Sequence, residues 1–134
     1  SDKKKILLIH HKAYDVWQQP GGHWEESESD PLKAARREGE EETGLKLGKN
    51  IPLDPKQPLI PFDIDSHPVP ARPNKDEPAH YHHGFRYIFL AEDVKPSHQI
   101  EEVLAAGWFK LDDSRTDRIQ KVIKKMQAAG ILLQ

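Results

Sequence analysis

Hydrophobic and polar positions alternate along this chain with periods that predict several separate strands. Four consecutive apolar residues, Ile6 to Ile9, lie within residues 3–9 and are typical of a strand that is buried on both faces. Residues 62–67 alternate instead between apolar and polar side chains, as expected of a half-buried strand. We expect Tyr81 to Ala91 to be the matching strand, and the turn-rich residues 70–79 to connect the two.

A helix is predicted after residue 30, because both of its ends carry the expected signals. Asp30 is an N-cap candidate, and Pro31 suits the first helical position, where a missing N–H costs nothing. Gly44 is the usual left-handed residue just past a helix end. One arc of this helix is small or apolar and is expected to be buried, and another is expected to face water. The first arc comprises Leu32, Ala35, Gly39 and Thr43, and the second comprises Lys33, Arg36 and Glu40.

The last third of the chain predicts a short strand followed by a helix. Residues 97–107 are expected to form a loop with a short helical turn, and residues 108–111 a short strand. A last helix, capped by Ser114 or Asp117, is expected to end near Gly130. Its apolar residues recur at the spacing of a helix face packed on a core. They are Ile119, Val122, Ile123 and Met126.

Composition excludes several classes of protein. The chain is expected to form one domain, residues 1–134, and it contains no cysteine, so neither disulfides nor thiol chemistry are available. A net charge of −2 offers no basic surface for nucleic acid, and no apolar run approaches the ~20 residues that span a bilayer. No signal peptide is visible, and the missing cysteines are compatible with a reducing compartment. We therefore expect a cytoplasmic protein with neither a nucleic-acid nor a membrane partner; a homodimer is left open.

Candidate chemistry lies on the helix that follows residue 30. Glu38, Glu41 and Glu42 fall within one arc of about 100°. Glu38 and Glu42 are four residues apart, where like charges destabilise a helix, so a cation is expected to compensate them. Mg²⁺ takes one or two carboxylates together with substrate phosphate and water. Arg37 can hold Glu41 through a forked hydrogen bond. The alternative is a solvated acidic face, which is what most runs of charge are.

The stretch from residue 20 to residue 45 resembles the signature of the Nudix hydrolases. That signature runs Gly, five residues, Glu, seven residues, and then Arg-Glu-apolar-x-Glu-Glu-x-Gly-apolar. Gly22 and Glu28 match its first half, and residues 37–45, REGEEETGL, match its second half. Two departures stand out: eight residues instead of seven follow Glu28, and a glycine occupies the first apolar position. The extra residue lies at the junction of loop and helix, where added length costs little.

The resemblance implies an α/β Nudix fold, in which a mixed sheet lies between helices in an α/β/α arrangement. Nudix proteins have another strand before the equivalent of residues 3–9, so we expect this chain to lack its N-terminal strand. The resemblance also implies hydrolysis of a phosphoanhydride bond with Mg²⁺, for which Mn²⁺ can substitute. The residues that match the family's metal ligands are the Gly22 carbonyl, Glu38, Glu42 and Glu41.

A general base is expected from a further glutamate, since Nudix hydrolases often carry one ahead of a Trp. Glu102, six residues before Trp108, is the candidate here, and Glu101 is the second choice. Glu41 is the alternative base, although a neighbouring Arg37 suits a metal ligand or an orienting group better. The residues assigned to catalysis are therefore Glu102, Glu41 and Arg37.

Substrate contacts are expected at two places. Glu25 matches an acidic position common in the family and lies three residues after Gly22, with His23 beside the same glycine turn. Arg86 could reach a phosphate from the predicted strand pair, and His82 lies on the same strand. Arg86 could equally extend into solvent.

Acidic and imidazole side chains also share faces of the predicted strand pair. Asp63, Asp65 and His67 lie on one face because strand side chains alternate, and so do His80 and His82. If the strands pair, these residues could form a second metal site or a phosphate-contacting patch. The alternative is polar pairing across an exposed sheet face.

The sequence thus predicts metal-dependent hydrolysis of a diphosphate bond in a nucleoside diphosphate linked to another group, with that small molecule as the partner. A nucleotide-sensing binding module without turnover is the alternative, and the intact Arg37, Glu38, Glu41 and Glu42 speak against it. A prenyl diphosphate isomerase, which the same fold also hosts, uses an active-site cysteine that this chain does not contain.

Overall fold

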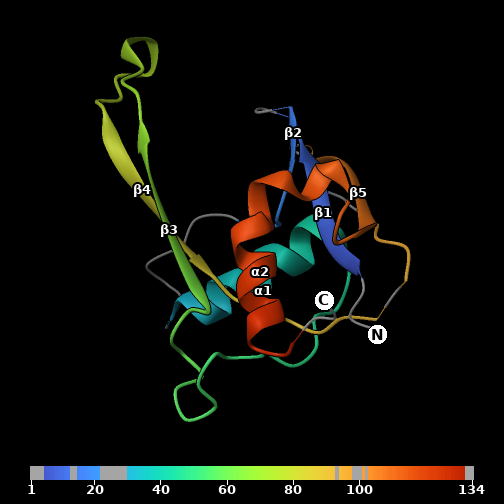
Figure 1. Ribbon diagram of the computed structural model, residues 1–134. Helices are drawn as coiled ribbons and strands as arrows, with labels where there is room; N and C mark the ends of the chain where they lie inside the picture. Colours follow the sequence, from blue (N-terminus) through green and yellow to red (C-terminus); the bar gives the residue numbers. More distant parts are fainter. Residues whose placement is uncertain are drawn as a thin grey trace.

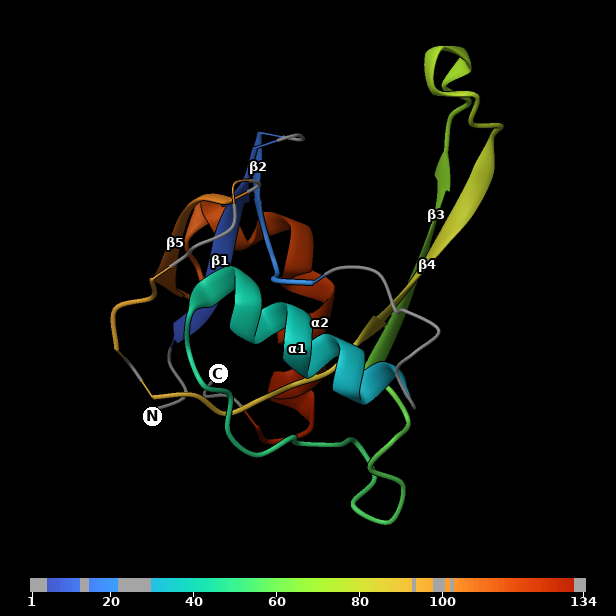
Figure 2. The ribbon, with the colours of Figure 1, turned by 180° about the vertical axis from the view of Figure 1, so that it is seen from behind.

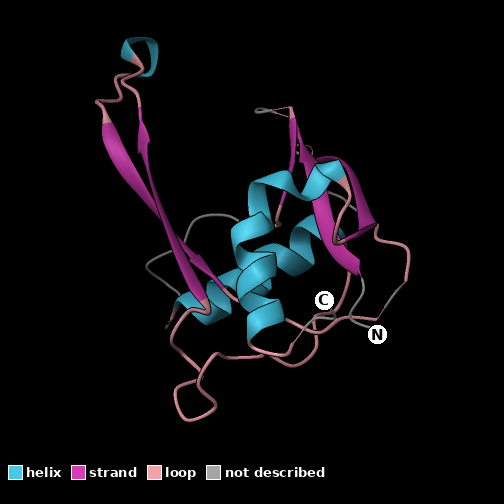
Figure 3. Ribbon diagram, in the orientation of Figure 1, coloured by secondary structure: helices cyan, strands magenta, loops and turns pink. Residues whose placement is uncertain are grey.

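The computed structural model describes residues 5–12, 15–21, 30–92, 94–97, 101 and 103–131. Within these residues five strands form two separate sheets, accompanied by two α-helices and two short 3₁₀ helices (Figure 3). In chain order the elements are β1 (Lys5–His11), β2 (Val16–Gln18), α1 (Pro31–Thr43), β3 (Asp63–Val69), η1 (Pro73–Lys75), β4 (His80–Arg86), β5 (Val103–Lys110), η2 (Ser114–Ile119) and α2 (Gln120–Ala128).

The larger sheet has the strand order β2–β1–β5, and both of its pairings are antiparallel. β1 is the central strand, which accounts for its unbroken apolar run, because both faces are covered. Leu8 and Ile9 are fully buried there. The strand predicted over residues 3–9 is therefore confirmed over its described part, and it continues to His11.

The two α-helices lie on opposite sides of this sheet. η2 and α2 lie in front of the strands in Figure 1, and α1 lies in front of them in Figure 2, which shows the molecule from behind. The apolar stripe predicted for the last helix is confirmed, since its members are all buried against Leu8 and Phe62. The architecture is that of an α/β protein, as expected. Neither helix of the described residues has the length and apolar character needed to cross a membrane.

β3 and β4 form a two-stranded antiparallel hairpin that projects from this body (Figures 1 and 2). The two strands pair as predicted, and residues 70–79 connect them. At the base of the hairpin Asp63 is buried, and its carboxylate lies 3.3 Å from Arg86 Nη1 and 3.4 Å from Lys125 Nζ of α2. The ion pair with Arg86 joins the two strands, and the ion pair with Lys125 attaches the hairpin to α2.

The strand predicted over Tyr81 to Ala91 was wrong at its end, because β4 stops at Arg86. Beyond that point the backbone turns to a different partner and bonds with residues 48–51. The Gly48 N–H donates to the Leu90 carbonyl at 2.7 Å. The chain therefore leaves the hairpin and returns along the segment that follows α1.

The loop predicted over residues 97–107 was also wrong in part, because β5 begins at Val103 rather than at residue 108. Ala105 and Ala106 pair with β1, and this pairing outweighs the low strand propensity of alanine. The cap of the last helical segment is Asp113, which accepts a hydrogen bond from the Arg115 N–H at 2.9 Å and precedes both of the predicted caps.

Candidate active site

The helix that carries the acidic row forms where its local signals predict. The Asp30 carboxylate accepts a hydrogen bond of 2.8 Å from the Lys33 N–H, and Pro31 occupies the first turn. At the other end Gly44 adopts a left-handed φ of 70°, and its N–H donates to the Glu40 carbonyl at 2.8 Å. Both ends are therefore fixed, and the positions of the glutamates between them follow from helical geometry.

Glu42 is buried and bonds to the backbone of Gly21, which follows β2. Its side chain is 4% exposed, and its Oε1 accepts a hydrogen bond of 2.5 Å from the Gly21 N–H. A buried carboxylate is stable only when its charge is compensated, and a hydrogen bond to a charged group contributes about 1.5–3 kcal/mol. This bond joins the two halves of the Nudix-like signature, because Gly21 directly precedes Gly22.

Arg37 lies between two carboxylates of the acidic row. Its Nη1 donates to Glu38 Oε1 at 3.0 Å and to Glu41 Oε2 at 3.3 Å. The contact with Glu41 is the one predicted from the four-residue spacing, and the contact with Glu38 is additional. One guanidinium thus fixes the rotamers of two acids and offsets their mutual repulsion.

Of the three charged residues of α1 that were predicted to face water, Lys33 is exposed, but Arg36 and Glu40 are partly buried against the segment that follows the helix. Arg36 Nη1 donates to the Leu47 carbonyl at 2.6 Å, and Glu40 Oε2 accepts from the Leu47 N–H at 2.8 Å. Arg36 also stacks over Phe89, with 4.7 Å from its guanidinium carbon to the ring centroid. These two residues hold the segment after α1 in place, a role that the helical pattern alone does not reveal.

The buried face of α1 was likewise predicted only in part. Gly39 and Thr43 are buried as expected, but Ala34 is buried in place of Ala35. A side chain at Gly39 would lie 2.8 Å from Leu47, so the glycine at this unusual signature position permits close packing.

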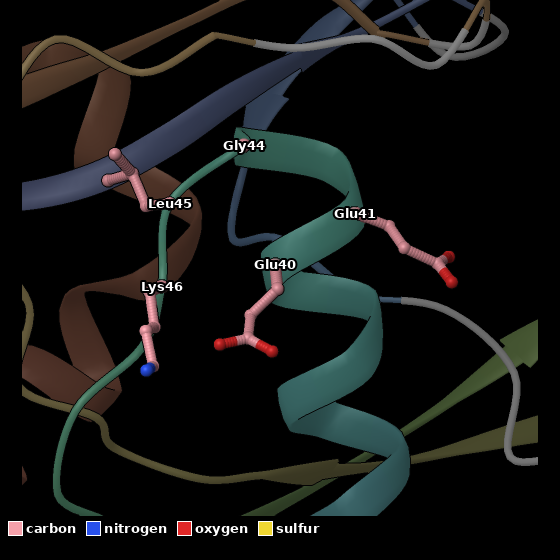
Figure 4. Close-up of a pocket in the computed structure, with 5 residues that line it drawn as sticks. All are labelled: Glu40, Glu41, Gly44, Leu45 and Lys46. Atoms are coloured by element: carbon pink, nitrogen blue, oxygen red, sulfur yellow. The ribbon is translucent and has the colours of Figure 1, made fainter.

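A shallow pocket lies beside the C-terminal end of α1 (Figure 4). Its lining residues are Glu40, Glu41, Gly44, Leu45 and Lys46. Figure 4 shows that Glu40 and Glu41 leave the helix in different directions. We do not assign the active site to this pocket, because neither Glu38 nor Glu42 is among its described lining residues.

Several predicted site residues lie outside the described residues. They are Gly22, His23, Glu25, Glu28 and Glu102. Glu101, the second choice for the base, is described and is exposed. The structure therefore brings together Arg37, Glu38 and Glu41 on one side of α1, and it joins Glu42 to the residue before Gly22.

The described glutamate carboxylates have the chemistry that a hard divalent cation requires of its ligands. Glu42 is buried beside the glycine turn, and Glu38, one helical turn earlier, has an 18% exposed side chain. Carboxylate oxygens are the ligands that Mg²⁺ and Mn²⁺ prefer. No three His, Asp or Glu side chains among the described residues already surround one point. The expected third ligand, the Gly22 carbonyl, lies in a part of the chain that is not described.

The predicted substrate residue Arg86 is engaged by acids at the base of the hairpin. Its Nη1 and Nη2 lie 3.3 Å from Asp63 and 3.9 Å from Asp65, respectively, and its side chain is 13% exposed. Its guanidinium therefore does not extend into solvent. His82 lies on the same face of β4, directly opposite His67 of β3.

The fold and the acidic helix together define a Nudix-type domain, and comparison with known proteins agrees. The family model of the NUDIX domain matches residues 1–128. The chain belongs to this family, which confirms the resemblance noted in its sequence.

Two similar proteins illustrate the relationship. The chain is 34% identical over 92 residues to the "Probable DHNTP pyrophosphohydrolase" of Lactococcus lactis subsp. cremoris (strain MG1363), over 66% of this chain and 48% of that protein. It thus spans about half the length of this relative. The fold is similar to the crystal structure of a hydrolase of the NUDIX family from Clostridium perfringens, with a TM-score of 0.68 and 22% identity over 96% of this chain and 90% of the other.

Proposed function

We propose that this chain is a metal-dependent pyrophosphohydrolase that cleaves a diphosphate bond in a nucleoside diphosphate linked to another group. The observation that carries the proposal is the buried carboxylate of Glu42 beside the glycine turn, one helical turn after Glu38. The name of the Lactococcus relative, a probable pyrophosphohydrolase, supports the same reaction class.

Glu38, Glu42 and the Gly22 carbonyl would hold Mg²⁺ or Mn²⁺, with Glu41 as a further ligand. When bound, the metal supplies charge neutralisation for the diphosphate oxygens and a lower pKa for the attacking water. The protein contributes orientation: Arg37 fixes Glu38 and Glu41 through one guanidinium nitrogen. The hydrogen bond from the Gly21 N–H holds Glu42 beside the residue that precedes the proposed carbonyl ligand in the sequence.

Proton transfer from the attacking water is assigned to Glu102, with Glu41 as the alternative. Glu41 Oε2 accepts a hydrogen bond from Arg37 at 3.3 Å, which suits an orienting or ligand role better than a base. Glu102 immediately precedes β5, whose first residue pairs with the end of β1. General base catalysis requires a carboxylate held within reach of the attacking water, which is the role proposed for Glu102.

We assign the binding of substrate groups beyond the diphosphate to Glu25 and His23, which follow Gly22 in the sequence, and to Arg86. Arg86 would have to exchange its contacts with Asp63 and Asp65 for a phosphate oxygen. Nucleotide sugars, ADP-ribose, oxidised nucleotides, dinucleoside polyphosphates and the DHNTP of the relative's name are the substrates to compare.

The test is a turnover screen on these diphosphates with Mg²⁺, following released phosphate or nucleoside monophosphate. Glu38→Gln should abolish most of the turnover. Glu40→Gln is the matched control, since it removes the same charge from the same helix while its amide oxygen can still accept from Leu47. Equal loss in both variants would contradict the assignment. Binding without turnover across the whole panel would favour the nucleotide sensor instead.

A further inference from the structure

One face of the hairpin formed by β3 and β4 is exposed along its whole length. Side chains alternate along a strand, so every second residue of each strand contributes to this face. Large apolar side chains are among them: Ile64 is 51% exposed, Phe85 43% and Tyr81 67%. Exposed apolar side chains gathered on one face mark a surface that binds a partner. The face consists of Ile64, Ser66, Pro68, Tyr81, His83 and Phe85.

The backbone of β4 presents hydrogen-bonding groups on the edge away from β3. Pro68 is paired with Tyr81, and proline has no N–H, so the backbone groups of this pair face outward instead of bonding to each other. This orientation alternates along the strand, so the N–H and C=O groups of His83 and Phe85 also face outward. The Arg86 carbonyl faces the other way, because it accepts a hydrogen bond of 2.8 Å from the backbone that leads into β3.

The two outer edges of the hairpin differ in their ability to accept another strand. Pro68 places a residue without an N–H donor on the outer edge of β3, which is one way in which natural sheets block pairing at an edge. The outward residues of β4 include neither a proline nor a lysine. Among the described residues β4 pairs with β3 alone, since their sheet has two strands. β4 is therefore the open edge.

The distribution of charge favours a second copy of this chain at that edge. A twofold contact brings the same surface patch of two copies together, so fixed charges of one sign within it would repel each other. The exposed face contains no Asp, Glu, Lys or Arg. The charges at the base of the hairpin lie on the other face, where Asp63 is paired with Arg86 and Lys125.

The order of residues in β4 is also self-complementary. An antiparallel pairing of two β4 strands centred on His83 places Tyr81 of each copy opposite Phe85 of the other. Aromatic pairs across neighbouring strands are among the favourable cross-strand contacts. In this alignment the outward N–H and C=O groups of both strands also face each other.

We propose that β4 pairs antiparallel with β4 of a second copy of this chain, so that two hairpins form one four-stranded sheet across a twofold axis at His83. The N–H groups of Tyr81, His83 and Phe85 then donate to carbonyls of the other copy. Ile64, the cross-strand partner of Phe85, extends the aromatic contact on the same face. The proposal does not rest on the proposed hydrolase activity, because these residues are neither the proposed metal ligands nor the proposed base.

Dimerisation has a structural consequence for the hairpin, which projects from the body of the protein (Figures 1 and 2). A two-stranded hairpin alone is marginally stable in water, whereas three or more strands with an apolar face are more stable. The edge of β4 is only seven residues long, so the contact belongs to the small and weak class of interfaces. The dimer should therefore depend on protein concentration.

The experiment is sedimentation equilibrium of the full chain between about 10 μM and 1 mM, the range in which such weak contacts form. The mass should rise from that of the monomer toward that of the dimer. Amide exchange at Tyr81, His83 and Phe85 should slow over the same range, because their N–H groups become bonded. Tyr81→Ala should move dimerisation to higher concentration, since it removes an aromatic contact without adding charge.

A charge exchange at His83 tests the twofold axis. His83→Lys and His83→Asp each place like charges opposite each other, so each variant alone should remain a monomer. An equimolar mixture of the two should dimerise again, which also shows that both variants are folded. His67→Lys is the matched control, because it makes the same change on the opposite face of the hairpin and should dimerise as the parent does.

Three outcomes would overturn the proposal. The first is a parent chain that stays monomeric throughout the concentration range. The second is slow exchange at the three N–H groups in a monomer, independent of concentration, which would assign the edge to another segment of the same chain. The third is a dimer in which these N–H groups still exchange rapidly or in which the His83 variants persist as dimers, since either result places the contact on another surface.

Discussion

The carboxylate of Glu42 accepts a hydrogen bond of 2.5 Å from the backbone N–H of Gly21, 21 residues earlier in the chain. This contact joins the last turn of α1 to the segment that leaves β2. It places a buried negative charge beside the residue that precedes the expected carbonyl ligand, Gly22. The carboxylate thus holds the backbone of Gly21, and our proposal gives it a second role, to supply charge for a metal; substitutions can separate the two.

Replacing Glu42 should separate those two roles. Glu42→Gln keeps an acceptor for the Gly21 N–H and removes the repulsion with Glu38, so unfolding free energy should stay within about 1 kcal/mol of the parent. Glu42→Ala removes the charged acceptor of the Gly21 N–H and should cost about 1.5–3 kcal/mol, the usual contribution of a hydrogen bond to a charged group. Thermal and urea denaturation measure the difference. Both variants should lose at least about tenfold in Mg²⁺-dependent turnover, since even partners of metal ligands contribute that much. Full turnover in Glu42→Gln would remove Glu42 from the site.

Gly44→Ala should destabilise the protein more than Gly130→Ala does. Both glycines have a left-handed backbone, with φ of 70° and 75°, so each alanine variant carries a conformational cost of about 1–2 kcal/mol. A Cβ at Gly44 would also clash with the Ser97 carbonyl oxygen, whereas nothing lies within 4 Å of one at Gly130. The melting temperatures of the two variants therefore isolate the steric part. Equal melting temperatures would show that the backbone at Ser97 yields freely.

The carboxyl of Asp113, at the start of η2, should make the stability of the protein depend on pH. Hydrogen bonds from the backbone and side chain of Arg115 lower the pKa of the Asp113 carboxyl in the folded state. The contribution of Asp113 to the free energy of unfolding is therefore present above its pKa in the unfolded chain, about 3.9. It is lost as the pH falls through the lower pKa of the folded state. Asp113→Asn keeps a capping oxygen without the charge. The difference in Tm between parent and variant should be constant from pH 7 to 5 and should shrink below about pH 4. A difference that persists to pH 2.5 would assign the effect to cap geometry instead.

Local signals in the sequence account for the parts of the fold that were predicted well. Asp30, Pro31 and Gly44 bound α1 correctly because a helix end depends on the residues within one turn of it. The apolar run of β1 and the stripe of α2 were also identified, since burial over a whole face imposes its period on the sequence. These features depend little on distant parts of the chain.

The features that were missed depend on distant partners. Arg36 and Glu40 bind the backbone of Leu47, and helical periodicity contains no information about the segment that returns beside α1. β5 extends over Ala105 and Ala106 because β1 lies beside them, although alanine does not favour strands. The hydrogen bond between Gly21 and Glu42 likewise required the fold to be known.

The last prediction concerns the general base. If Glu102 takes the proton of the attacking water, Glu102→Gln should lower kcat by roughly 10²–10⁴-fold, the usual contribution of a positioned proton acceptor. The Mg²⁺ concentration for half-maximal rate should change little, because the proposed ligands on α1 remain. A metal ligand would behave differently, since its loss raises the Mg²⁺ requirement and excess metal restores part of the rate. The measurement is kcat as a function of Mg²⁺ concentration.

Glu101→Gln and Glu41→Gln complete the comparison among the three acids. Glu101 is exposed immediately before Glu102 and should behave as the parent, which makes it the matched control for the loop. Glu41 is bonded to Arg37, so its variant should raise the Mg²⁺ requirement more than it lowers the rate at saturating metal. Rescue of Glu102→Gln by excess Mg²⁺ would make Glu102 a ligand and move the base to Glu41. A Glu102→Gln variant with the parent's kcat, beside a Glu101→Gln variant that is impaired, would move the base by one residue.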